Sequence, residues 1–282
     1  MTEASALLAW FIAASGVFGL LIGSFLNVVV WRVPRGESLL PGSHCPACEA
    51  PIRAWQNVPV LSWLALRGRC ARCRARISIR YPLVELATAV AFALVAWWFA
   101  TAFGSPLALD ALGQAAWWLR LAGYLWFAAA SIALTLIDLE HQRLPDAIVL
   151  PSLGVVTALL VIAAALTGDW GQLIATVAAA AALFALYFVI ALVYPRGIGG
   201  GDVKLAPLIG AVLGAIGWGA VAVGAFAGFL VGAVYGLILI ALRRATRKTG
   251  IPFGPFMLLG AWIGIVWGDA LMAAYLRLAG IG

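Results

Sequence analysis

The sequence has few charged residues for its length. Only 10% of its 282 residues are charged, two are histidines and four are cysteines, whereas 65% are hydrophobic and the mean hydropathy is +1.05. Water-soluble globular domains contain about 25% charged residues, so this composition excludes that class. It indicates a protein that crosses a membrane several times.

Long apolar runs recur along the chain, and about 20 residues are enough for one transmembrane helix. We therefore expect an all-α polytopic membrane protein with about eight transmembrane helices. The first is not expected to be a cleavable signal peptide, because its leading segment carries Glu3 and no basic residue. The expected helices, of which the sixth is short, lie near residues 6–30, 83–103, 116–137, 147–167, 172–194, 203–217, 219–242 and 254–279.

Basic residues are concentrated on one side of the expected topology. If the helices alternate in direction, sixteen of the 18 lysines and arginines fall on a single side. Cytoplasmic loops carry the excess of basic residues in membrane proteins, so this side is predicted to be cytoplasmic and both termini to lie outside. The net charge of +7 is then explained by basic loops that face anionic membrane lipid. It gives no reason to expect a nucleic-acid partner.

A polar insert at residues 32–82, between the first two expected helices, contains all four cysteines. They form two Cys-x-x-Cys pairs, Cys45 with Cys48 and Cys70 with Cys73, separated by 21 residues. Two such pairs supply four thiolates to one tetrahedral ion, and Zn²⁺ is the expected occupant. Two disulfides are the alternative, which a reducing cytoplasm disfavours, and iron would suit the same ligands.

The insert divides the chain into three expected parts. These are a first transmembrane helix at 1–31, a tetra-cysteine zinc-binding insert at 32–82 and a seven-helix membrane domain at 83–282. An insert of some fifty residues has too small a core to fold unaided, so the metal is expected to be structural. His44 is expected at the surface, because four cysteines already complete the coordination shell.

Two aspartates stand at the ends of apolar runs. Asp138 lies inside the apolar pattern of the third expected helix, and Asp202 lies at the start of the sixth. The chain crosses the membrane twice between them, so both are expected at the cytoplasmic face. Two carboxylates in a partly desolvated site do not both ionise easily, and such a pair can activate water as in aspartic proteases. The alternative is that each caps its own helix or pairs with Lys204, Arg143 or Arg196.

Three glycines, Gly199, Gly200 and Gly201, precede Asp202. Glycine has no side chain, so these residues would form a site wall with clearance for an extended substrate backbone. The same pattern is also typical of an ordinary turn. A hinge that brings Asp202 to Asp138 only when substrate binds would leave the same pattern.

Several segments together resemble the bacterial type IV prepilin peptidases, which are bifunctional membrane aspartic proteases. The resemblance extends over nearly the whole chain and includes the paired cysteines. Its other segments are Gly-Ser-Phe-Leu-Asn-Val-Val at 23–29, Arg-Tyr-Pro-Leu-Val-Glu at 80–85, the Asp-x6-Pro-Asp segment at 138–146, Gly-Gly-Gly-Asp at 199–202 and Ile-Pro-Phe-Gly-Pro-Phe at 251–256.

This resemblance implies that Asp138 and Asp202 are the catalytic residues. It implies a prepilin or pseudopilin substrate at the bacterial inner membrane, cut after a glycine that ends a short basic leader on the cytoplasmic side. It also implies N-methylation of the new terminus with S-adenosylmethionine as methyl donor. The sequence contains no dinucleotide-type glycine fingerprint, so the methyl-donor binding residues stay unknown.

Two other functions remain open from the sequence. One is a peptidase without methylation, and the other is a non-enzymatic scaffold or transporter whose intramembrane aspartates bind a cation.

Overall fold

The structure is a computed structural model that describes residues 3–40, 42–194, 198–244, 246 and 250–280. Its described part is helical, with isolated bridges at His44–Pro51 and Arg69–Arg76. The longer helices are α1 (Glu3–Arg32), α3 (Arg80–Phe103), α4 (Ala111–His141), α5 (Asp146–Leu166), α6 (Trp170–Val193), α7 (Gly200–Gly214), α8 (Trp218–Ala241) and α9 (Gly254–Leu278). The shorter ones are η1 (Val33–Arg35), η2 (Ala54–Asn57), α2 (Leu61–Ala65) and η3 (Pro106–Ala108).

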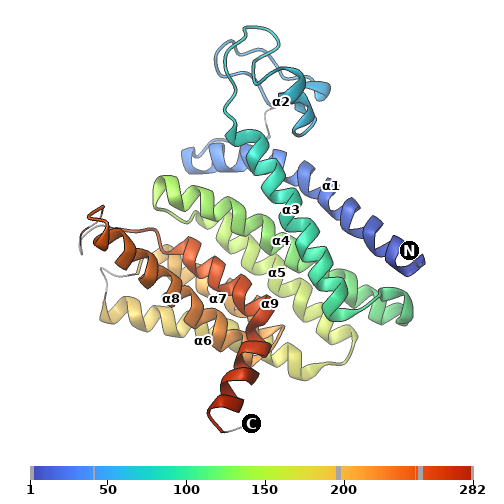
Figure 1. Cartoon of the computed structure of the whole chain (residues 1–282), viewed down its shortest axis with the longest axis vertical. Helices are drawn as coiled ribbons and strands as arrows, with labels where there is room; N and C mark the ends of the chain where they lie inside the picture. Colours follow the sequence, from blue (N-terminus) through green and yellow to red (C-terminus); the bar gives the residue numbers. More distant parts are fainter. Residues whose placement is uncertain (1–2, 41, 195–197, 245, 247–249, 281–282) are drawn as a thin grey trace. The chain divides into compact units, whose positions relative to one another are not determined.

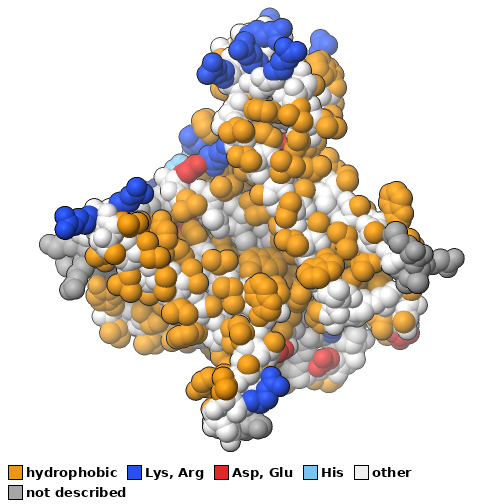
Figure 2. All heavy atoms as spheres, in the orientation of Figure 1, with side chains coloured by type: hydrophobic (Ala, Val, Ile, Leu, Met, Phe, Trp, Pro, Cys, Tyr) orange, Lys and Arg blue, Asp and Glu red, His pale blue; other side chains and the backbone are white. Residues whose placement is uncertain are grey.

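The all-α membrane fold expected from the sequence is confirmed. Among the described residues, seven helices are long and apolar enough to cross a membrane. Helix α7, with 15 residues, is the short run expected as the sixth helix. Apolar side chains cover much of the helical surface (Figure 2), as a lipid environment requires. The chain is therefore a multi-pass membrane protein.

The helices form two compact units, residues 1–104 and 105–282. The three-part division inferred from the sequence stays a prediction. In the first unit, α1 and α3 lie side by side and the cysteine-containing insert connects them (Figure 1). Gly23 allows this approach, because a Cβ there would lie 2.7 Å from the Glu85 Cα. Basic side chains gather on the insert (Figure 2).

The second unit is a bundle of α4 to α9 built around α7 (Figure 1). Helix α7 packs against α5, α6, α8 and α9, and most of its residues are buried. A helix that is apolar on all faces belongs in the interior of such a bundle. Since Asp202 lies in the first turn of α7, this central position places its carboxylate inside the protein.

Helices α8 and α9 approach closely through glycine. Gly224, Gly228, Gly232 and Gly236 follow one another at four-residue spacing, and all four face α9 or the segment that leads into it. Their role is structural, because small residues allow membrane helices to pack tightly. The contact holds the N-terminal end of α9 in place.

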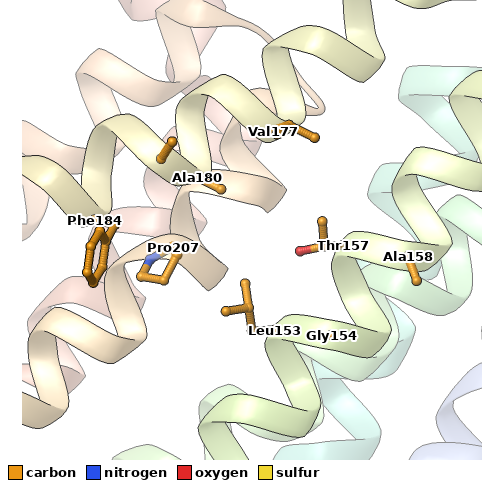
Figure 3. Close-up of a pocket in the computed structure, with 9 residues that line it drawn as sticks. Leu153, Gly154, Thr157, Ala158, Val177, Ala180, Phe184 and Pro207 are labelled. Carbon is orange, nitrogen blue, oxygen red and sulfur yellow. The ribbon is translucent and has the colours of Figure 1, made fainter.

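An apolar groove of about 460 Å³ opens between α5, α6 and α7 (Figure 3). Leu153 and Thr157 of α5 face Ala180 and Phe184 of α6 across it, and Pro207 of α7 also lines it. The lining contains no charged side chain. The groove therefore suits an apolar chain or helix and is unsuited to a charged ligand.

Candidate active site and metal site

Asp138 occupies the last turn of α4 and is only 4% exposed. Its Oδ2 accepts a hydrogen bond of 3.2 Å from the backbone N–H of Gly254, the first residue of α9. The first N–H groups of a helix have no partner inside it, so a carboxylate is a favourable acceptor there. The segment 251–256 thus contributes directly to the surroundings of Asp138.

Asp202 is 8% exposed, and its Oδ2 accepts a hydrogen bond of 3.0 Å from the Gly199 N–H. It precedes the apolar run of α7 and lies outside the seven candidate spans. Burial raises the pKa of Asp202 to about 6, although the Gly199 N–H acts in the opposite direction, and the negative charge of Asp138 adds to the increase. The structure therefore places the two predicted aspartates near enough for the charge of Asp138 to act on Asp202.

Leu144 connects the surroundings of the two aspartates. Its side chain packs against Gly201, where an added Cβ would lie 3.0 Å from the Leu144 Cβ. The same side chain packs against Gly254, where an added Cβ would lie 3.2 Å from one Leu144 methyl group. Leu144 was missed in the sequence, because one leucine in a polar stretch before a proline carries no recognisable signal.

The capping and pairing alternatives are only partly realised. Asp202 does cap its own helix, because its carboxylate accepts the hydrogen bond of the Gly199 N–H. Lys204 pairs with Asp146 and not with Asp202, at 2.8 and 2.7 Å from its Nζ to the two Asp146 carboxylate oxygens. Arg196 lies outside the described residues. Within the described ranges, neither candidate aspartate forms an ion pair with Lys204 or Arg143.

Tyr187 of α6 is a second residue that sequence reasoning missed. It is 2% exposed, its ring stacks on Phe229 with centroids 5.4 Å apart, and it interacts electrostatically with Asp202. Phe253, next to Gly254, lies beside the same pair of rings. Tyr187 lies inside a long apolar run, and the periodicity of that run does not distinguish it from the ordinary core residues around it.

The three glycines before Asp202 have different surroundings. A Cβ added to Gly200 would meet nothing within 4 Å, whereas one added to Gly201 would be close to Leu144. At Gly199 the nearest neighbour of an added Cβ would be the Asp202 Oδ2, at 3.4 Å. Open space beside this segment is thus found at Gly200, and Gly201 is required for packing.

The four cysteines of the insert form one cluster. Their sulfur atoms all lie within 4.8 Å of one another, and those of Cys45 and Cys73 are 3.8 Å apart. A tetrahedral site with metal–sulfur distances of about 2.3 Å requires sulfur–sulfur distances of about 3.8 Å, so the cluster fits a metal ion. All four are free thiols, and the backbone N–H groups of Cys73 and Arg72 lower the pKa of Cys70 to about 6. His44 is exposed, as expected.

Comparison with known proteins decides the family. Residues 17–99 match the bacterial peptidase A24 N-terminal domain, and residues 125–237 match the type IV leader peptidase family. The prepilin leader peptidase/N-methyltransferase of Stutzerimonas stutzeri is 36% identical to this chain, with 95% of both chains covered. The chain belongs to the type IV leader peptidase family. Relatives of the same name from Pseudomonas putida and Neisseria gonorrhoeae are 37% and 35% identical over at least 96% of both chains.

No solved structure gives a significant match to this leader peptidase. The resemblance seen in the sequence is nevertheless confirmed by the relatives. The four cysteines fall in the N-terminal match, and Asp138 and Asp202 fall in the peptidase match. The two candidate sites therefore belong to separately recognised parts of the family.

The aspartate site has the features that peptide hydrolysis by an acid–base pair requires. Two buried carboxyl groups act on each other electrostatically, and each has one oxygen held by a backbone N–H. Their other oxygens are the ones that can exchange protons with water and substrate.

Proposed function

We propose that this leader peptidase removes the short basic leader of prepilin or pseudopilin precursors with Asp138 and Asp202 as catalytic residues. The observation that carries the proposal is the proximity of two buried carboxyl groups, at the end of α4 and the start of α7. Leu144 packs against both Gly254, which binds Asp138, and Gly201, which precedes Asp202, and the charge of Asp138 acts on Asp202. Gly199, Gly200 and Gly201 are proposed as the wall of the site. The open space at Gly200 supports its use as clearance for the substrate backbone.

In the proposed reaction the aspartate pair carries one proton. The ionised carboxylate removes a proton from water, and the water oxygen attacks the carbonyl carbon after the last leader residue. The protonated carboxyl group then gives its proton to the departing nitrogen as the carbon–nitrogen bond breaks. The Gly254 and Gly199 N–H groups fix the orientation of both carboxyl groups throughout.

The active site and the insert are proposed to face the cytoplasm of a bacterium, with both termini outside the inner membrane. The distribution of basic residues supports this orientation, since they collect in the loops on one side. The exposed arginines of the insert suit anionic lipid headgroups. A cytoplasmic site also matches a substrate whose basic leader has not crossed the membrane.

Methylation of the new N terminus is the second proposed activity, and the name of the relatives supports it. The terminal nitrogen, after losing its proton, donates its lone pair to the methyl carbon of S-adenosylmethionine. The carbon–sulfur bond breaks, sulfur keeps the electron pair and becomes neutral, and the nitrogen releases a second proton. The chain's own residues must hold the donor and exclude competing water.

The proposed function is tested by incubating the purified full chain with a precursor peptide, with and without S-adenosylmethionine. The masses of the products are then measured by mass spectrometry. We expect loss of the leader in both samples and a further gain of one methyl group only with the donor. Leader removal without addition of a methyl group would indicate that the chain is a peptidase without methyltransferase activity. An intact precursor in both samples would contradict the proposal and favour a cation-binding scaffold.

We further propose that the four-cysteine cluster holds one structural Zn²⁺ ion. Elemental analysis of the purified chain is expected to find one zinc per chain, and Cys48→Ser is expected to lose it. Because the metal supplies folding free energy to the insert, trypsin should then cut the variant rapidly at its exposed arginines. His44→Ala is the matched control, since His44 stands beside Cys45 outside the cluster. Iron in place of zinc, or thiols paired in disulfides, would contradict the assignment.

A further inference from the structure

A large cavity with both polar and apolar lining lies in the first unit, and none of its lining residues belongs to the second unit. Its volume is about 810 Å³, and its lining residues come from the end of α1, the insert and the start of α3. Ligand-binding cavities usually measure about 300–1,000 Å³, so this one has room for a nucleoside joined to an amino acid. The apolar groove of the second unit has no charged lining, which makes it unsuited to such a ligand.

Glu85 supplies a negative charge to the cavity from the first turns of α3. It is 7% exposed, its Oε2 accepts a hydrogen bond of 2.7 Å from the Val60 N–H, and the Ser24 hydroxyl approaches the same carboxylate. In the described part of the first unit, no lysine, arginine or histidine forms an ion pair with it. A buried carboxylate at the start of a membrane helix is costly, and a cationic ligand would compensate it.

The backbone around Val60 is strained to make this contact. Val60 has φ +60°, a conformation that β-branched residues rarely adopt, and its N–H points at Glu85. Strain of this kind persists only where the surrounding structure imposes it, and it is concentrated at functional sites. The short helix α2, which begins at Leu61, is thereby attached to the membrane helix that carries Glu85.

Other lining groups match the remaining parts of such a ligand. Trp63 is fixed by a 3.2 Å hydrogen bond from its Nε1 to the Ile77 carbonyl oxygen, and its ring offers an aromatic surface for a base or a cation. Asn27 donates to the Tyr81 carbonyl oxygen at 3.1 Å, which orients its amide. Arg53, which is exposed, also lines the cavity, and its guanidinium suits a carboxylate.

We propose that this cavity is the S-adenosylmethionine site, with Glu85 opposite the positive sulfonium group. The assignment rests on the methylation in the proposed function, and it names the residues that bind the methyl donor. Trp63 would contact the adenine, Asn27 would hydrogen-bond polar groups of the ligand, and Arg53 would pair with the methionyl carboxylate. No residue of the second unit is required for binding.

The decisive variant is Glu85→Gln, which keeps the shape and removes the charge. Isothermal titration of the full-length zinc-loaded protein in detergent should show S-adenosylmethionine binding weakened at least about tenfold, the loss expected when a charge-assisted contact becomes neutral. S-adenosylhomocysteine lacks the positive charge, so its binding should weaken less than about threefold. Glu49→Gln, at an exposed acid outside the cavity lining, is the matched control and should change neither affinity.

A second variant keeps the test decisive if Glu85→Gln misfolds and loses zinc. Ser62→Phe adds bulk to the cavity lining while leaving Glu85 in place, and it should weaken both ligands equally and strongly. Unchanged affinity in either correctly folded variant, or equal weakening of both ligands by Glu85→Gln, would overturn the assignment. If the wild-type chain methylates its product while Glu85→Gln and Ser62→Phe bind S-adenosylmethionine normally, only the location of the donor site is refuted. A wild-type chain that neither binds nor methylates refutes the methylation itself.

Discussion

Asp138→Asn and Asp202→Asn are each expected to abolish leader removal. Asparagine is nearly isosteric with aspartate and keeps an oxygen that can accept the Gly254 or Gly199 N–H, so the fold should be preserved. It cannot exchange a proton, and loss of general acid–base catalysis lowers rates by about 10²–10⁴-fold. Initial rates of precursor cleavage by the purified variants measure the effect, with zinc content and thermal stability as checks on folding.

Asp146→Asn is the matched control for both variants. Asp146 is the last acid of the same Asp-x6-Pro-Asp segment, but it is about half exposed and is paired with Lys204. Exposed ion pairs contribute about 0–1 kcal/mol, so this substitution should change the cleavage rate less than about threefold. Full processing by either of the buried-site variants would refute the catalytic assignment and leave a cation-binding role for the two aspartates.

Much of this arrangement could be predicted because it depends on counts and spacings. Counting membrane crossings predicted Asp138 and Asp202 on the same side, and in the structure the charge of Asp138 acts on Asp202. The spacing of the cysteines predicted one cluster, which the sulfur positions confirm. Both predictions concern side chains that are rare in this chain, so each stands out against the apolar background.

The remainder depends on tertiary contacts that leave no mark in a single sequence. Gly254 contributes a backbone N–H, which every residue except proline possesses, so only its position against Asp138 makes it special. Leu144 and Tyr187 are apolar or nearly so in a chain that is 65% hydrophobic. Their place beside the aspartates follows from how α4, α6, α7 and α9 pack, which periodicity alone does not determine.

Gly254→Ala is expected to lower kcat about 100-fold without unfolding the protein. An added Cβ would lie 2.8 Å from the Asp138 Oδ2 and 3.2 Å from a Leu144 methyl group. Either the carboxylate turns away from the N–H or the start of α9 shifts, and misplacement of a catalytic group by about 1 Å can cost about 10²-fold. Steady-state kinetics with a precursor peptide would separate the change in kcat from the change in KM.

Gly200→Ala should give the opposite kinetic pattern if Gly200 provides clearance for substrate. Its added Cβ meets no protein atom, so the two carboxyl groups keep their positions and kcat stays within about threefold, while KM rises about tenfold as substrate loses room. Gly236→Ala, whose Cβ would make an ordinary 3.8 Å contact with Ile251, should change neither constant. A fall in kcat for Gly200→Ala with KM unchanged would instead indicate the hinge, since a stiffer segment would hinder the approach of Asp202 to Asp138 in the bound complex. The two glycines therefore separate positioning of the carboxyl groups from admission of the substrate backbone.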